Sequence, residues 1–222
     1  MVDFDINTCT HMSPAQLEPI LGDSGVCAVA RDLDLRLLWC NEQFATNMDS
    51  TPEALIGTML SDCMTEEQAY EREKVFKKVK EDGCMHAHQQ VWVGARWLTR
   101  CWPLDPEAFG QEGYFVLITR LCDDLPTNLD EVTLVRSADL GHFESLTPRE
   151  LEVLYYLGMG LSVADVAKTL FRADKTIGRH AESIYKKMGY SNRAALVKDV
   201  VENGLVSFSG EEWKKLTDPR AD

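Results

Sequence analysis

The sequence Leu146-Thr147-Pro148-Arg149-Glu150 decides how the C-terminal part of this 222-residue chain folds. Thr147 can accept a hydrogen bond from a free backbone N–H group at the start of a helix, and Glu150, three residues later, can return one to Thr147. Pro148 suits the first helical position, because an N–H group there would have no partner within the helix. These features predict a helix that begins at Pro148, and Gly158-Met159-Gly160 can end it.

Three more helices are predicted after this one. Ser162 and Asp165 repeat the capping pattern and start the second helix. The third runs over residues 175–188 and stops at Gly189, and the fourth runs over residues 191–204. Four short helices in succession are typical of a small DNA-binding domain.

The predicted third helix has two distinct faces. Residues that recur at steps of three and four should pack on the other helices, and these are Ile177, His180, Ala181, Ile184 and Met188. The opposite face carries Lys175, Gly178, Arg179, Glu182, Ser183 and Lys186. That second face is free to meet a partner.

A known family combines these motifs. The chain has Leu-Thr-Pro-Arg-Glu at 146–150, Gly-Leu-Ser at 160–162, Lys-Thr-Ile at 175–177 and Lys-Met-Gly at 187–189. With these spacings, residues 145–206 resemble the LuxR-type (GerE) helix-turn-helix of bacterial transcription regulators. The resemblance implies that the second helix braces the third, that the third enters the major groove, and that the fourth supplies a dimer contact in many members.

The same resemblance implies which residues touch DNA. We expect Arg179, Lys186 and Ser183 in the groove, with Lys175 and Lys187 on phosphates. The full expected set is Lys175, Thr176, Gly178, Arg179, Glu182, Ser183, Lys186, Lys187 and Arg193.

The chain departs from the family pattern at three positions of the third helix. Ala173 stands where a Ser usually caps this helix, which leaves Asp174 to favour the helix dipole instead. Gly178 and Glu182 occupy groove-facing positions that are commonly Lys or another polar residue. Gly178 costs about 1 kcal/mol of helix propensity relative to Ala, and Glu182 repels phosphate unless it accepts a bond from a cytosine.

Charge is distributed unevenly along the chain. The net charge is −13, yet residues 141–205 hold nine Lys and Arg against eight Asp and Glu, a net of +1. Residues 1–140 hold eleven against twenty-four, a net of −13. The helix-turn-helix is barely basic, so DNA affinity should depend on dimerisation and on local clusters of cations.

The N-terminal part predicts an α+β domain. Apolar strand-like runs at 26–30, 35–40, 85–93, 97–104 and 114–122 enclose several short helices. One of these helices covers 65–82, begins with a capping box of Thr65 and Gln68, stops at Gly83, and has a buried stripe of Ala69, Tyr70, Phe76 and Val79. This order indicates a five-stranded antiparallel sheet with helices. Together with the runs at 29–32, 39–44 and 52–57, it is similar to a PAS domain over residues 16–123. Such a resemblance implies a sensory or dimerising module.

The remaining segments complete the expected organisation. Residues 1–15 are expected to form an arm, and a short helix is predicted over 14–21. Residues 124–144 form a partly helical linker, residues 145–206 the all-α helix-turn-helix domain, and residues 207–222 a tail helix capped by Ser209.

The sequence does not require a cofactor in the PAS-like domain. Leu60-Ser61-Asp62-Cys63-Met64-Thr65 lacks the Gly-Arg-Asn-Cys-Arg-Phe run of photoactive flavin members, so we do not expect a flavin adduct on Cys63. No His falls within residues 41–82, where haem-binding members place their axial ligand. Cys84, His86 and His88 alternate in a strand and are the one candidate metal set, although a row of polar side chains on a strand more often has no metal.

Seven cysteines without close pair spacing indicate reduced thiols. Cys27, Cys40, Cys101 and Cys122 fall in apolar runs and should be buried, which is typical of cysteine as a small hydrophobe. No apolar run of about eighteen residues and no basic-then-apolar leader is present, so a cytoplasmic protein is expected.

The sequence indicates a transcriptional regulator in which a PAS-like sensor controls a LuxR-type helix-turn-helix. No catalytic constellation emerges, so an enzyme is not expected. The expected partners are double-stranded DNA, a second copy of the chain, RNA polymerase and a small-molecule ligand of the PAS-like domain, but no membrane. Two alternatives stay open, namely a protein-interaction module that has lost DNA binding and a haem- or metal-dependent sensor.

Overall fold

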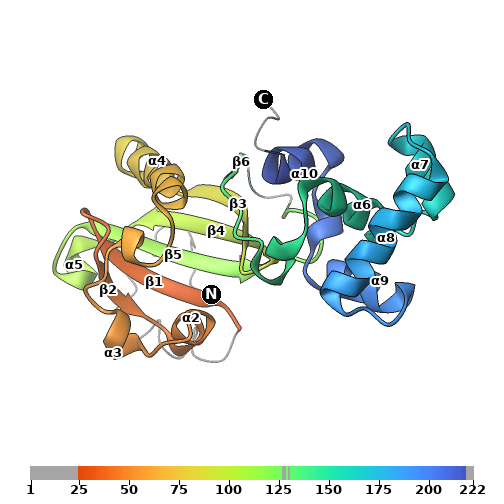
Figure 1. Cartoon of the computed structure of the whole chain (residues 1–222). Coiled ribbons are helices and arrows are strands. Elements are labelled where there is room, and N and C mark those ends of the chain that lie inside the picture. Colours follow the sequence, from red (N-terminus) through yellow and green to blue (C-terminus); the bar gives the residue numbers. More distant parts are fainter. Residues whose placement is uncertain (1–24, 127–128, 130, 219–222) are drawn as a thin grey trace, which may run out of the picture. The chain divides into compact units, whose positions relative to one another are not determined.

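The computed structural model describes residues 25–126, 129 and 131–218 (Figure 1). The predicted arm and the short helix expected at Pro14 lie outside these residues. The chain divides into two compact units. Of the described residues, the first unit contains 25–88, Leu98–Thr119 and Glu131–Thr133, and the second contains Gln89–Trp97, 120–126, 129 and 134–218.

The sheet has six strands in the order β2-β1-β5-β4-β3-β6. Their bounds are β1 Cys27–Asp32, β2 Leu37–Cys40, β3 His86–Trp92, β4 Ala95–Pro103, β5 Gly113–Arg120 and β6 Val132–Leu134. Strand β1 pairs antiparallel with both β2 and β5. The prediction of five strands missed β6, which lies in the segment predicted to be a partly helical linker. Val132-Thr133-Leu134 is a short run rich in β-branched residues, and its pairing with a distant strand left no local signal.

The helices of the first unit are α2 Glu42–Asn47, α3 Pro52–Leu55, α4 Glu66–Asp82 and α5 Pro106–Phe109, with a 3-10 turn at Leu60–Asp62. Helix α4 covers the predicted range 65–82, whereas α5 was not predicted, because its Pro- and Gly-rich segment indicated a loop. In α4, Thr65 and Gln68 form the predicted capping box, and Gly83 ends the helix in the left-handed conformation.

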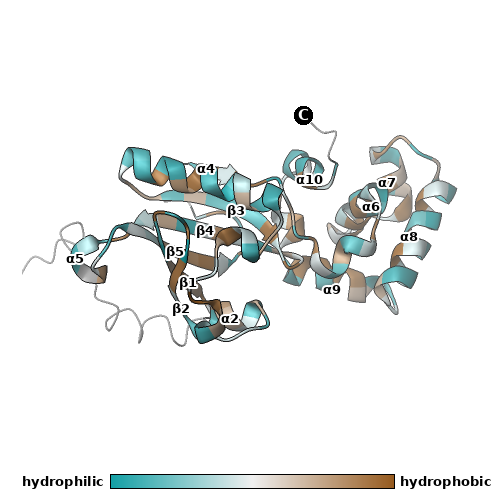
Figure 2. Ribbon diagram, turned by 60° about the vertical axis from the view of Figure 1, so that its left-hand side comes forward, coloured by the Kyte–Doolittle hydropathy of each residue, from teal (hydrophilic) through white to brown (hydrophobic). Residues whose placement is uncertain are grey.

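The buried face of α4 differs from the prediction at one position. Ala69, Phe76 and Val79 are buried as expected, but Tyr70 is 60% exposed, and Arg72 is buried instead. The Arg72 guanidinium donates to the backbone oxygen of Gln68. In Figure 2 most of α4 is hydrophilic, as befits a helix with a single buried stripe. The resulting first unit is a sheet domain with helices, which confirms the predicted α+β class.

The second unit contains the four predicted helices and the predicted tail helix. The helices are α6 Pro148–Gly158, α7 Val163–Thr169, α8 Asp174–Met188, α9 Arg193–Glu202 and α10 Gly210–Thr217. Two 3-10 turns, Gly141–Ser145 and Leu205–Ser207, lie before α6 and after α9. Their core contains Leu154, Val166, Ile177, Ile184 and Leu196, all fully buried.

The tail helix α10 packs on α6. Ser209 and Glu212 form its predicted capping box. The Trp213 ring stacks on Tyr155 of α6 at 5.6 Å, and its indole N–H donates to the backbone oxygen of Leu151 at 3.2 Å. Because the ring is also 2% exposed, α10 is an integral part of the helical core.

The second unit also includes the turn of the β3–β4 hairpin. Arg96 of this hairpin is buried and donates to the side-chain oxygen of Gln89 and to the backbone oxygen of Asp123. Its guanidinium lies 4.6 Å from the ring centre of Phe208. A buried cation needs this many partners to offset the loss of its hydration. The compact unit that contains these helices therefore also includes residues of the β3–β4 hairpin.

No helix among the residues described here is long and apolar enough to span a membrane.

Candidate nucleic-acid interface

Helix α8 is the central element of the site. It begins after Ala173, which makes no side-chain cap, and Asp174 lies in its first turn as predicted. Gly189 ends the helix in the left-handed conformation. Ile177, Ala181 and Ile184 are buried, so one face is fixed against the core and the opposite face is left for contacts outside the unit.

A buried carboxylate connects α6 to α8. Glu150, which is 4% exposed, accepts hydrogen bonds from the Ser183 hydroxyl at 2.6 Å and from the Lys187 ammonium at 2.7 Å. It also accepts from the backbone N–H of Thr147 at 2.8 Å. Lys187 donates in addition to the backbone oxygen of Ser145. Glu150, which belongs to the capping box of α6, therefore also fixes the orientation of α8.

These bonds control the acidity of Glu150. Burial alone would raise its pKa, but the hydrogen bonds from Lys187, Ser183 and Thr147 outweigh burial and lower the pKa to about 2. The side chain is ionised at neutral pH, and its charge is neutralised by a cation within the same unit.

The structure divides the predicted DNA-contacting residues into two groups. Among the residues that the structure describes, the exposed members with no hydrogen bond or ion pair from their side chains are Lys175, Thr176, Arg179, Glu182 and Lys186. Gly178 is half-buried, and a Cβ atom added to it would meet nothing within 4 Å. This group forms the outer face of α8.

The second group is engaged inside the domain. Ser183 and Lys187 are bound to Glu150 as described. The Arg193 guanidinium donates to the backbone oxygens of Gly160 and Leu161, so it closes the turn between α6 and α7. The sequence could not show these roles, because each partner lies more than thirty residues away along the chain.

Phe171, which lies between α7 and α8, is a further candidate residue that the helix-turn-helix motifs do not indicate. Its side chain is 89% exposed and its φ angle is +52°. A large aromatic residue next to the helix predicted to enter the groove could have indicated a contact residue. The sequence alone could not show that it is exposed, because its exposure depends on the backbone conformation of the turn.

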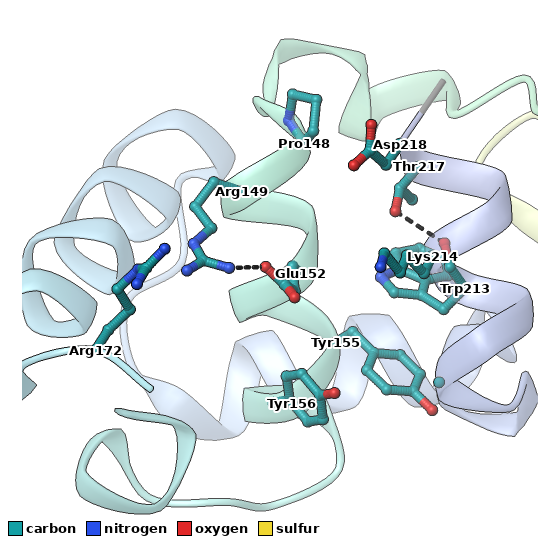
Figure 3. Close-up of a pocket in the computed structure, with 11 residues that line it drawn as sticks. Pro148, Arg149, Glu152, Tyr155, Tyr156, Arg172, Trp213, Lys214, Thr217 and Asp218 are labelled. Atoms are coloured by element: carbon teal, nitrogen blue, oxygen red, sulfur yellow. Dashed lines mark hydrogen bonds and ion pairs between the residues drawn. The ribbon is translucent and has the colours of Figure 1, made fainter. Parts of the chain in front are cut away.

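A polar hollow of about 360 Å³ lies between α6, α10 and the turn before α8 (Figure 3). Arg149 of α6 is paired with Glu152, and Arg172 reaches toward Arg149 from the turn. Lys214 and Asp218 line the α10 side. The cations and carboxylates of its lining are interleaved, so the hollow does not offer a uniformly positive surface.

The three members of the candidate metal set in the first unit do not converge, although the Cys84 sulfur lies 4.0 Å from the His86 ring nitrogen. His88 is buried, and neither of its ring nitrogens has a hydrogen-bond partner. Desolvation by this burial lowers its pKa to about 3. His86 instead faces Asp82, with 2.7 Å between nitrogen and oxygen, and Cys84 is exposed. Within the described ranges, no group of three or more potential metal ligands is found.

The cysteines of the described segments are free thiols. Cys27, Cys40 and Cys101 are buried, as predicted. The prediction for Cys122 was wrong, because its thiol is exposed and lies 3.4 Å from the backbone oxygen of Glu202. Strand β5 ends at Arg120, before this residue.

Comparison with known proteins identifies the helical segment. Residues 144–199 match the family model of bacterial regulatory proteins of the luxR family. This match confirms the resemblance inferred from the motifs for the α6–α9 region.

Similar curated proteins are transcriptional regulators by name. An HTH-type transcriptional regulator of Mycobacterium bovis is 38% identical over 63 residues, which cover 28% of this chain and 7% of that protein. The transcriptional regulatory protein YxjL of Bacillus subtilis is 36% identical over 63 residues, which cover 28% of this chain and 29% of that protein. The chain thus spans less than a third of the length of these relatives.

Solved structures with a similar course of the chain are more distant. The Vibrio cholerae VqmA–ligand–DNA complex aligns over 89% of this chain and 91% of that one, with 18% identity and a TM-score of 0.47. A PAS domain from Colwellia psychrerythraea aligns over 48% of this chain and 95% of that one, with 12% identity and a TM-score of 0.41.

Proposed function

We propose that this chain is a sequence-specific DNA-binding transcriptional regulator in which the PAS-like domain controls the LuxR-type helix-turn-helix. The observation that carries the proposal is the outer face of α8, where exposed cations have no partner among the described residues. Surface cations whose side chains form no ion pair remain available to phosphate. The match of residues 144–199 to the luxR family supports the same conclusion.

The spacing of the free cations fits a major groove. Lys175, Arg179 and Lys186 stand four and seven residues apart, so they lie along one side of α8. At a rise of 1.5 Å per residue they cover about 16 Å, compared with a groove width of about 12 Å. We therefore infer that Lys175 and Lys186 reach phosphates at the groove edges and that Arg179, between them, reaches base edges. In this arrangement Ser183 and Lys187 position α8 and do not contact DNA. Lys186, which was expected inside the groove, contacts a phosphate at the groove edge instead.

The other expected partners follow from this function. Two copies of the chain would present two α8 helices to one site, since helix-turn-helix proteins commonly bind as dimers. RNA polymerase is the partner through which a bound regulator would act on transcription. A small molecule in the PAS-like domain would supply the signal, and no catalytic role is assigned.

Replacement of Arg179 by Ala tests the proposed reading role. With a duplex selected from random DNA by the wild-type protein, R179A should lose about 1–3 kcal/mol of discrimination against mismatched DNA if Arg179 contacts a guanine. Lys198→Ala is the matched control, because Lys198 is an exposed cation of α9 that lies 3.7 Å from Glu202. Equal discrimination by R179A and wild type would reject the role of Arg179.

A second candidate function is a protein-interaction module without DNA binding. Glu182 favours it, because this exposed carboxylate on the outer face of α8 would repel phosphate. Binding to random duplex at low salt separates the two functions. A DNA-binding protein shows affinity that falls steeply with salt, whereas an interaction module retains no duplex.

A further inference from the structure

Phe171 is the most exposed large hydrophobic side chain in the described part of the chain. Its exposed fraction is 89%, and the next values are 60% for Tyr70 and 52% for Ile56 and Val93. Its neighbour Leu170 packs against the core of the second unit, and Phe171 does not. The ring therefore adds nothing to the packing of the domain that carries it.

The backbone at Phe171 is also unfavourable. After α7, the N–H of Phe171 bonds to the oxygen of Lys168 and the N–H of Arg172 bonds to the oxygen of Ala167, which ends the helix in a tight turn. This turn requires a positive φ at Phe171, +52°, a conformation that Gly or Asn adopts more easily than an aromatic residue. A strained and exposed Phe is unfavourable for folding on both counts, so its role must be sought outside the fold.

The charges around Phe171 indicate an anionic partner. Lys168, Arg172 and Lys175 are exposed within four residues of it. The nearby acidic residues are Asp165, which is held by Ser162 and lies 3.5 Å from Lys168, and Asp174, in the first turn of α8. The turn leads directly into α8, so a duplex held by the outer face of α8 would be the nearest anionic surface.

We propose that Phe171 is part of the DNA interface, where its ring packs on deoxyribose and on a thymine methyl group at the edge of the groove read by α8. Phenylalanine is among the residues that make such apolar contacts. The contact fixes the depth at which the N-terminal end of α8 enters the groove. This inference rests on the proposed DNA-binding function and adds an apolar contact to it.

Phe171→Gly tests the inference, because it removes the ring and the backbone strain together. On the duplex selected by the wild-type protein, F171G should raise Kd about 5- to 30-fold, as expected for the loss of a half-buried aromatic contact. The slope of affinity against salt should stay unchanged, since no phosphate contact is lost. The midpoint of thermal unfolding should stay equal or rise. Phe171→Asn, which also tolerates positive φ, should reproduce both results.

The control variant is Met159→Ala, which shortens another exposed apolar side chain of the same unit and should leave Kd unchanged. An F171G protein that binds the duplex as tightly as wild type overturns the inference alone. A reduced salt slope also overturns it, because the change would then lie in phosphate contacts. If the wild-type protein retains no duplex at low salt, the proposed function and this inference both fail.

Discussion

Glu150→Gln is the perturbation that tests how the helix-turn-helix is held together. The wild-type carboxylate accepts bonds from Ser183, Lys187 and Thr147 while 4% exposed. The glutamine side chain has nearly the same size, but it loses the negative charge and one of the two acceptor oxygens. The ammonium of Lys187 would then lack its counter-charge, and one donor of the cluster would lack an acceptor.

The pKa of Glu150 sets the magnitude. It falls from 4.5 to about 2 on folding, which corresponds to about 3 kcal/mol of stabilisation at neutral pH. Because the folded pKa lies below the unfolded one, this contribution is complete above pH 4.5 and disappears as the pH falls toward 2. By pH 3 about 2 of these 3 kcal/mol should be lost. We therefore expect E150Q to be about 2–3 kcal/mol less stable at pH 7 and much closer to wild type at pH 3.

The assay is urea denaturation of the full chain at both pH values, followed by far-UV circular dichroism. Glu152→Gln is the control, since Glu152 is two residues away on α6 and its side chain is 34% exposed beside Arg149. A surface pair of this kind contributes at most about 1 kcal/mol. If E150Q were no less stable than E152Q, or if its deficit were the same at pH 3 as at pH 7, the argument that Glu150 fixes α8 would be refuted.

Two further substitutions follow from the same structure. Gly178→Ala should stabilise the protein by about 1 kcal/mol in thermal unfolding, because alanine has the higher helix propensity and its Cβ atom would meet nothing within 4 Å. A loss of stability would show that the added Cβ atom does not fit at this position. His88→Leu should raise stability at pH 7 by about 1–3 kcal/mol, since it removes two buried nitrogens without partners. The pKa of His88 is lowered to about 3, so the wild-type protein should lose stability as the pH falls below 6.5, and the variant should lose less over that range. If the wild-type protein and H88L lost the same free energy of unfolding between pH 7 and pH 5, burial of the His88 ring would not be the cause.

Helix ends were the part of the fold best predicted from the sequence. The capping boxes at Thr65, Thr147 and Ser209 and the cap at Ser162 all form, because each joins residues three apart and needs no tertiary contact. Side-chain placement within the elements was less certain. Tyr70 is exposed because burial on α4 depends on what packs against that helix, which the sequence alone does not give.

The sequence predicted which residues share the outer face of α8, but not which of them are bonded within the unit. Lys175, Arg179 and Lys186 lie on the outer face of α8, as the helical period required. The bonds of Ser183 and Lys187 to Glu150 join positions 33 and 37 residues apart, so periodicity could not distinguish these residues from their free neighbours. A pattern shows which face of a helix is polar, whereas only the tertiary structure shows which polar groups are already satisfied.

The carboxylate of Glu150 has opposite effects on the proposed DNA binding. It fixes α8 through Lys187, and it thereby withdraws one cation from the set available to phosphates. If Lys175 and Lys186 each neutralise one phosphate, one copy of the chain would show a salt slope of about −1.8, and two copies on one site about twice that value. Few phosphate contacts mean weak binding to random DNA, so selective binding would depend on base contacts and on the pairing of two copies. A nearly neutral helix-turn-helix is consistent with such a regulator, because a low affinity for random DNA increases the ratio of specific to non-specific binding.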